Sequence, residues 1–250
     1  MDLQLRGKAA LVTGGASGVG REIALALAAE GAAVAVNYHR SAEAAAALVA
    51  EIAAAGGQAV GCAADIADFA AVQTMIGRIV ADFGRLDILV NNAGVALRRP
   101  FMQQTPDDWR RQIDVCLYGA IHCCHAAAPM LERSGAGRIL CLIGDSSRVG
   151  ESGLALVAAA RAGVVGLAKS LAREFGRFGT TVNVLSLGLV ETEHDRAWVE
   201  ANRERLERLY PLHRLGRAGD VAPMAVLLAS PLAGWITGQV LSVSGGYSMA

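Results

Sequence analysis

The chain has 250 residues, which is long enough for one large domain with a substantial hydrophobic core. Its 23 Lys and Arg residues balance its 23 Asp and Glu residues, so no basic excess can neutralise phosphates and we expect no nucleic-acid partner. A charged fraction of 18% beside 53% hydrophobic residues excludes a disordered chain.

The sequence carries no clear signal for export or membrane insertion. Its most apolar stretch, residues 154–171, is interrupted by Arg161 and Lys169, which argues against a membrane span. Residues 1–6 lack the basic-then-apolar layout of a secretory signal. The five cysteines are odd in number and scattered, which suits a reducing compartment better than a disulfide scaffold. We therefore expect a cytoplasmic protein with no membrane partner.

Short apolar strands alternate with helical stretches along the chain. Strands are predicted over residues 8–13, 33–37, 58–62, 86–91, 138–143, 181–185 and 239–243. Helices are predicted from a glycine-rich turn to residue 30, and over residues 41–55, 69–83, 106–131, 154–175 and 221–229. Ser41 is expected to cap the second helix. This alternation predicts one α/β domain, residues 1–250, whose parallel sheet has helices on both faces.

Residues 191–210 differ from the rest of the chain because they are highly charged. Their only large apolar anchors are expected to be Trp198, Leu206 and Leu209. The pattern is compatible with a solvated surface helix and with a mobile lid over a substrate pocket.

A glycine-rich turn, residues 13–20, lies between the first strand and the first helix. Gly14 permits a tight turn, Gly18 lets the backbone approach a pyrophosphate, and Gly20 permits close helix packing. The anion would rest on the free N–H groups at the start of the helix. The turn, with Ser17 and Val19 between its glycines, is therefore predicted to bind a dinucleotide.

The end of the second strand indicates which dinucleotide. NAD-selective sites usually place an acidic residue there to bind the ribose 2′-hydroxyl. Residues 32–41 contain no acid, whereas Arg40 with Ser41 beside it could bind a 2′-phosphate. NADP(H) is favoured over NAD(H).

Further motifs extend over essentially the whole chain. They are Asp65 after the third strand, Asn91-Asn92-Ala93-Gly94 after the fourth, Gly137-Arg138-Ile139 at the fifth, and Thr181-Val182-Asn183-Val184 at the sixth, followed by Gly188 and Thr192. Together these motifs resemble the classical short-chain dehydrogenase/reductase family. The resemblance is closest to the branch of 3-oxoacyl-carrier-protein reductases and glucose dehydrogenases.

The resemblance implies a doubly wound Rossmann-type fold with a seven-stranded parallel sheet, and homotetramers or homodimers formed through the long helices. It also implies NAD(P)H binding. Asp65 and Ile66 would contact the adenine, and Val190 and Thr192 would face the nicotinamide amide. The adenosine ribose would be lined by Asn92, Ala93 and Gly94.

The catalytic set implied by the resemblance is Asn, Ser, Tyr and Lys, and none of these stands at its position. Alignment without gaps places the Ser position on Gly144, the Tyr position on Val157 and the Lys position on Arg161, while the Asn position falls on Cys116. Val157 has no proton to give, and Gly144 removes a hydrogen-bond donor. Arg161 stays charged, although its fork could hold the ribose hydroxyls. A general acid contributes about 10²–10⁴-fold, so ordinary ketone reduction by the family route is not expected.

The sequence offers only partial replacements for the missing serine and tyrosine of the catalytic set. Ser146 and Ser147 lie just past the empty serine position. Tyr118 is expected to point elsewhere, and Tyr210 and Tyr247 could reach the pocket only from a lid or from a neighbouring subunit.

Cysteine and histidine side chains crowd one predicted helix at Cys116, His122, Cys123, Cys124 and His125. Four ligands on one straight helix cannot surround a zinc ion, so no metal site is predicted. Cys116 would lie beside the nicotinamide, where a redox or nucleophilic role and simple packing both stay open.

Three functions are compatible with these features. The first is hydride transfer between NADP(H) and a small-molecule acceptor that is already activated, such as an imine or enone, with Arg161 free for an anionic group. The second is a catalytically silent relative that acts as an NADP(H) sensor, a scaffold or the partner subunit of an active homologue. The third is a non-redox cyclase, isomerase or lyase.

Overall fold

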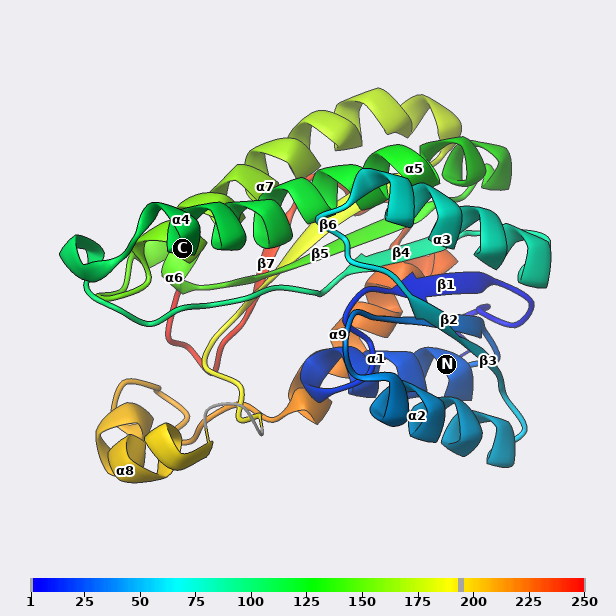
Figure 1. Cartoon of the computed structure of the whole chain (residues 1–250). Helices are drawn as coiled ribbons and strands as arrows, with labels where there is room; N and C mark the ends of the chain where they lie inside the picture. Colours follow the sequence, from blue (N-terminus) through cyan, green and yellow to red (C-terminus); the bar gives the residue numbers. More distant parts are fainter. Residues whose placement is uncertain (1, 193–195, 250) are drawn as a thin grey trace.

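The computed structural model describes residues 2–192 and 196–249, and its centre is one sheet of seven parallel strands (Figure 1). The strand order is β3-β2-β1-β4-β5-β6-β7. The strands are β1 (Ala9–Val12), β2 (Ala33–Tyr38), β3 (Gln58–Ala63), β4 (Ile88–Asn91), β5 (Arg138–Gly144), β6 (Thr181–Leu187) and β7 (Val240–Val243). The predicted doubly wound α/β fold is confirmed.

The chain reverses its direction of winding between β1 and β4. Val12 pairs in register with Val36 of β2 on one side and with Val90 of β4 on the other. The carboxyl ends of these three strands are therefore level, and the crevice above them is where ligands bind in open parallel sheets.

Helices cover both faces of the sheet (Figure 1). One face carries α1 (Gly18–Ala29), α2 (Ala42–Ala54) and α9 (Ala218–Ala229). The other carries α3 (Phe69–Phe83), α5 (Gly119–Ser134) and α7 (Ala155–Phe175). Because apolar side chains of β1, β4 and β5 reach both helix layers, the central strands are buried on both sides.

The long helix predicted over residues 106–131 is present, but it contains a π-helical turn that was not predicted. The structure has α4 (Pro106–Ile113), a π-helical turn (Asp114–Tyr118) and then α5. Thr105 and Asp108 form a reciprocal capping box that starts α4. The wider turn places Cys116 against Val95, and such turns are frequent at functional sites.

Two smaller expectations also fail. Ser41 precedes α2 but its side chain makes no capping hydrogen bond, because its backbone is not in the extended conformation typical of an N-cap. A short helix, α6 (Ser146–Val149), follows β5 where the sequence is loop-like.

The charged segment forms α8 (Arg196–Glu207), which stands apart from both helix layers in Figure 1. Residues 193–195 of the predicted lid lie outside the described residues. The anchor predicted at Leu209 is wrong, since that side chain is 54% exposed. A small cluster instead attaches the helix to the body of the protein, and it consists of Val199, Leu206, Tyr210 and Leu215.

The stretch Ala155–Phe178 is long and apolar enough, by length and composition alone, to cross a membrane. Here its helix α7 packs along β5 and β6 as part of the second layer. Only 28% of its apolar window is buried within the chain, so one side of α7 faces outward.

Candidate functional site

Four connections meet at the carboxyl edge of the sheet. The glycine-rich turn follows β1, residues 92–95 follow β4, α6 follows β5, and residues 188–192 follow β6. The sheet order therefore brings together segments that are far apart in the sequence.

The glycines of the turn are required by its backbone and by its close contacts. Gly14 and Gly18 have φ angles of +58° and +54°, which glycine adopts at little cost. A Cβ on Gly20 would lie 2.5 Å from the carbonyl oxygen of Gly14 and would overlap the side chain of Asn92. Gly20 thus packs against the turn itself, rather than only bringing helix and sheet together.

Two side-chain amides, those of Asn92 and Asn37, brace this turn. Asn92 Nδ2 donates to the carbonyl oxygens of Thr13 (2.9 Å) and Gly14 (3.1 Å), and the Thr13 hydroxyl accepts from Asn92 N and Ala93 N. From β2, Asn37 Oδ1 accepts from Gly14 N at 3.2 Å. The Asn92 side chain therefore supports the turn, and sequence reasoning missed Asn37, whose signal is a polar residue at the end of a buried strand.

The start of α1 fits an anion. Ser17 stands at the N-cap, yet its side chain makes no capping bond, and the first turn of the helix has no acidic residue. Val19 packs its side chain against the core, so only its backbone can face a ligand. Free N–H groups and the positive end of the helix dipole favour a phosphate at this position.

The end of β2 leaves Arg40 and Ser41 exposed. Within residues 2–192 and 196–249, Arg40 makes no ion pair, whereas its neighbour His39 lies 3.8 Å from Asp65. Asp65 Oδ1 accepts from Ala67 N at 3.0 Å. A guanidinium and a hydroxyl are thus both available beside the adenosine end of the crevice.

The other predicted cofactor residues border the same crevice. Ile66 is buried, and its side chain packs against Gly119 of α5. Val190 forms a parallel bridge with Gly216. The Thr192 methyl group would lie 3.4 Å from a Cβ on Gly18, so the segment after β6 approaches the glycine turn.

Two of the four positions that the resemblance assigns to a catalytic set lie in a hydrophobic cluster. Cys116 and Val157 are 5% and 2% exposed and pack with Leu154 and Ala160. The Cys116 thiol donates to the carbonyl oxygen of Val95 at 3.2 Å. This geometry favours the packing role for Cys116, because apolar side chains surround the thiol.

The other two positions lie side by side. A Cβ on Gly144 would be 3.4 Å from Arg161 Nη1 and 3.3 Å from Ser146 Oγ. A Cβ on Gly94 would be 2.7 Å from Arg161 Nη2. The guanidinium therefore lies between the turn after β4 and the end of β5, in space that larger residues would occupy.

A buried carboxylate, which sequence reasoning did not single out, follows Gly144. Asp145 is 1% exposed, and its Oδ1 accepts from the Ser186 hydroxyl of β6. Its Oδ2 is buried without a hydrogen-bond partner among the described residues. The Asp145 backbone carbonyl accepts from Arg148 N and Val149 N, so this residue also starts α6 and positions Ser146.

Two tyrosines stack on each other, Tyr210 just after α8 and Tyr247 near the end of the chain. That they reach the substrate from a lid or a neighbouring subunit stays a prediction. Tyr210 and Tyr247 lie with ring centroids 5.2 Å apart, and the Tyr210 hydroxyl accepts from Leu189 N at 2.8 Å. Burial, with the nearby negative charges of Glu151 and Asp145, raises the pKa of Tyr247. Tyr118 is half exposed on its helix, away from the tyrosine stack.

Arg98 connects the charged helix to the loop after β5. Its guanidinium lies 4.7 Å from the ring centre of Trp198 in α8, and its Nη2 lies 2.8 Å from a Glu151 carboxylate oxygen. These contacts attach α8 to the rest of the chain through Arg98.

The cysteines and histidines of α5 lie in two different environments. His122 and His125 pack around Phe69 of α3, with ring centroids 5.3 and 5.4 Å apart, and His122 Nδ1 lies 2.9 Å from the Ile66 carbonyl oxygen. Cys123 points into the core, where burial raises the pKa of its thiol to about 12. No metal-ligating group of three or more such side chains is found among the described residues.

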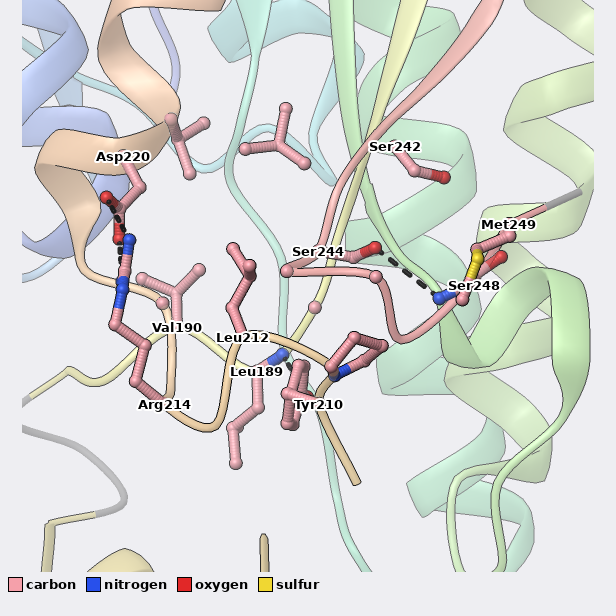
Figure 2. A pocket seen from close by; sticks show the side chains of 17 residues that line it. Leu189, Val190, Tyr210, Leu212, Arg214, Asp220, Ser242, Ser244, Ser248 and Met249 are labelled. Atoms are coloured by element: carbon pink, nitrogen blue, oxygen red, sulfur yellow. Dashed lines mark hydrogen bonds and ion pairs between the residues drawn. The ribbon is translucent and has the colours of Figure 1, made fainter. Parts of the chain in front are cut away.

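A pocket of about 550 Å³ adjoins the segment after β6 (Figure 2). Tyr210, Leu212 and Met249 contribute to its largely apolar wall, and the Arg214–Asp220 ion pair stands at one side. Hydrogen bonds from Arg214 lower the pKa of Asp220 to about 2. Tyr210 lines this pocket and also belongs to the cluster that packs against α8.

Known proteins resemble this chain over nearly its whole length. A family model described as enoyl-(acyl carrier protein) reductase matches residues 14–248. The 3-oxoacyl-[acyl-carrier-protein] reductase FabG of Staphylococcus aureus is 41% identical over 242 residues, which cover 97% of this chain and 98% of that protein. The D-threitol dehydrogenase of Mycolicibacterium smegmatis is 38% identical over 249 residues, covering 99% and 95%.

A solved structure has the same fold. The crystal structure of a dehydrogenase/reductase from Sinorhizobium meliloti 1021 aligns with a TM-score of 0.92 at 35% identity, covering 99% of this chain and 98% of that one. The chain belongs to the classical short-chain dehydrogenase/reductase family, in the branch of the 3-oxoacyl-acyl-carrier-protein reductases.

Proposed function

We propose that this oxidoreductase transfers hydride between NADP(H) and a small molecule that is already activated, such as an imine or a conjugated enone. The observation that carries the proposal is the contrast between the two halves of the crevice. The glycine turn and its amide braces are complete, whereas Cys116 and Val157 are buried in an apolar cluster.

The choice of NADP(H) rests on the end of β2. Arg40 and Ser41 are exposed there, and the Ser41 hydroxyl is not used as a helix cap. A guanidinium suits a 2′-phosphate because its planar fork donates several hydrogen bonds to phosphate oxygens. The diphosphate would rest on the start of α1, next to Ser17. The same proposal places the ribose hydroxyls of the nicotinamide end beside Arg161, and the amide beside Val190 and Thr192.

The choice of an activated hydride acceptor rests on the lack of a proton donor at position 157. When bound, NADPH supplies hydride, and the oxygen of an ordinary ketone then needs a proton. Val157 has no proton to supply, and an acid at its position would be worth roughly 10²–10⁴-fold. An iminium ion accepts hydride without gaining negative charge, and an enone spreads that charge over several atoms. Both therefore depend less on a nearby acid.

The proposal is tested by titrating purified protein with NADPH and NADH while nucleotide fluorescence is recorded. We expect NADPH to bind at least tenfold more tightly than NADH, and Arg40→Ala to remove most of the difference. Cyclic imines and enones are then screened by loss of NADPH absorbance, with an aliphatic ketone as the comparison. If neither nucleotide binds, the proposal is wrong.

One observation favours a second function, that of a catalytically silent NADP(H)-binding subunit. The apolar packing of Cys116 and Val157 fills space that the family uses for catalysis. Tight NADPH binding without turnover of any imine or enone would support this alternative over hydride transfer.

We also propose that the protein forms homodimers or homotetramers through its long helices. The support is that α7, although apolar, keeps most of its apolar window outside the chain's own core. Analytical ultracentrifugation gives the oligomeric state directly, and a monomer at micromolar concentration would contradict this proposal.

A further inference from the structure

We propose that Arg161 and Ser146 form a binding site for a carboxylate on the substrate, so that the preferred substrates are anionic. The inference rests on the proposed function, because it assigns a substrate class to the same crevice. It depends on the position of one guanidinium and one hydroxyl.

The two groups lie close together beside the same glycine. Arg161 Nη1 and Ser146 Oγ are 3.4 and 3.3 Å from the position that a Cβ on Gly144 would take. Because residue 144 has no side chain, both groups can pack beside its Cα. A guanidinium N–H and a hydroxyl this near to each other are a suitable pair of donors for the two oxygens of one carboxylate.

Arg161 makes no ion pair with an acidic side chain within the described part of the chain, although Arg98, Arg99 and Arg203 all do. The nearest carboxylate in sequence to this site, Asp145, is bonded to Ser186 instead. Arg161 is half-buried, so water screens its charge less than that of a surface arginine. A partly buried guanidinium without an acidic partner favours an anionic ligand.

The position of Ser146 in the chain is fixed by its neighbour Asp145. Asp145 starts α6 through its carbonyl oxygen and is fixed to β6 by the Ser186 hydroxyl. The two ends of the guanidinium also differ, because Nη2 lies beside Gly94 and Nη1 lies beside Gly144. Nη2 can therefore remain with the ribose while Nη1 addresses the substrate.

A matched pair of ligands tests the inference, namely crotonate and its neutral counterpart crotonamide. Calorimetric titrations are made with cofactor-free protein and with protein saturated with NADP⁺. We expect crotonate to bind roughly tenfold or more tightly than crotonamide, since hydrogen bonds to charged groups are worth about 1.5–3 kcal/mol. Arg161→Gln should remove this preference, and Ser146→Ala should reduce it.

Two further variants guard against trivial explanations. Arg161→Lys keeps the positive charge but loses the planar guanidinium with its paired N–H donors. It should retain part of the preference for crotonate over crotonamide. Arg177→Gln, in the 3-10 turn that follows α7 and with its guanidinium over the ring of Phe178, is the matched control and should change nothing. Equal affinities for crotonate and crotonamide in both protein forms, or a preference that survives Arg161→Gln, would overturn the inference. Failure to bind NADP⁺ contradicts the proposed function separately, since crotonate is also titrated without it.

Discussion

The guanidinium of Arg161 occupies the space that a side chain at Gly94 would need, because a Cβ on Gly94 would lie 2.7 Å from Nη2. Gly94 belongs to the turn after β4 and Arg161 to α7, so this contact links the two sides of the crevice. The observed place of the guanidinium, though not the presence of an arginine at residue 161, therefore depends on the absence of a side chain at residue 94.

Gly94→Ala should therefore displace the guanidinium while leaving Arg161 in the chain. We expect the preference for crotonate over crotonamide to fall at least threefold, with little loss of stability, since the end of a long side chain can move. Gly166→Ala is the control on the same helix, because a Cβ there meets nothing within 4 Å. It should leave ligand binding unchanged and stabilise the protein by about 0.5–1 kcal/mol. An unchanged preference in Gly94→Ala would show that the guanidinium does not act from this position.

Gly20→Ala should be far more damaging than a typical glycine substitution. The added Cβ would overlap Asn92 and would lie 2.5 Å from the Gly14 carbonyl oxygen, and neither group can move without breaking the braces of the turn. We expect NADPH affinity to fall at least tenfold and the melting temperature to drop. Gly77→Ala, in open space on α3, serves as the control and should bind NADPH normally. Normal binding by both variants would contradict the assigned role of the turn.

The fold could be predicted from the sequence because its strands are short apolar runs bounded by turn residues. The helix over residues 69–83 was predicted with its observed bounds, since Asp68 caps it and Gly84 ends it. The π-helical turn at residues 114–118 could not be predicted, because it inserts one residue into a continuous helix and residues 114–118 include neither Pro nor Gly to mark it. The prediction that Ser41 caps α2 failed for a different reason. Serine is a common N-cap residue, but the backbone of Ser41 does not adopt the conformation that a cap requires.

The site was only partly predictable. Motif spacing located the glycine turn and the positions of Gly144, Val157 and Arg161. It could not show that Ser146 and Arg161 converge, because that depends on how α6 leaves β5. The stacking of Tyr210 with Tyr247 depends on contacts between a tail and a helix connection, which no local pattern records.

Asp87→Asn should make the free energy of unfolding less dependent on pH in the acidic range. Asp87 is buried, which by itself would raise its pKa, but hydrogen bonds from Arg85, Ser134 and the Ala9 backbone outweigh burial and lower it. A carboxyl whose pKa is lower in the folded state stabilises the protein above its unfolded value of about 4, and this stabilisation is lost as pH falls through the folded value. The variant should therefore be less stable by about 2 kcal/mol near pH 7, with a difference that shrinks below pH 4.

Urea unfolding of both proteins between pH 3 and pH 7 measures this difference. Asp107→Asn is the control, because that carboxylate is exposed and pairs only with Arg110 at the surface. If wild type and Asp87→Asn differ in free energy of unfolding by the same amount at every pH, the charge of Asp87 is not what stabilises the start of β4.

Restoring the family's catalytic set in one step should fail. The combined variant Cys116→Asn, Gly144→Ser, Val157→Tyr and Arg161→Lys places a tyrosine where Val157 is 2% exposed among Leu154 and Ala160. Overpacking of this kind costs about 1–3 kcal/mol and moves the new hydroxyl away from its working position. We expect a lower melting temperature and no NADPH-dependent reduction of acetoacetyl thioesters. Measurable reduction by the combined variant would show that the pocket has kept its original shape.

Arg98→Ala should release α8 from the body of the protein. Its guanidinium stacks on Trp198 and pairs with Glu151, and a cation–π contact of this kind is worth about 0.5–1 kcal/mol. Loss of that stabilisation should increase cleavage by thermolysin between residues 189 and 216 by roughly two- to fivefold, since proteolysis follows the population of the open state. Arg99→Ala is the matched control, because Arg99 lies on the same loop but pairs with Asp108 instead. Equal cleavage rates in the two variants would mean that the cluster around Tyr210, and not Arg98, holds the helix in place.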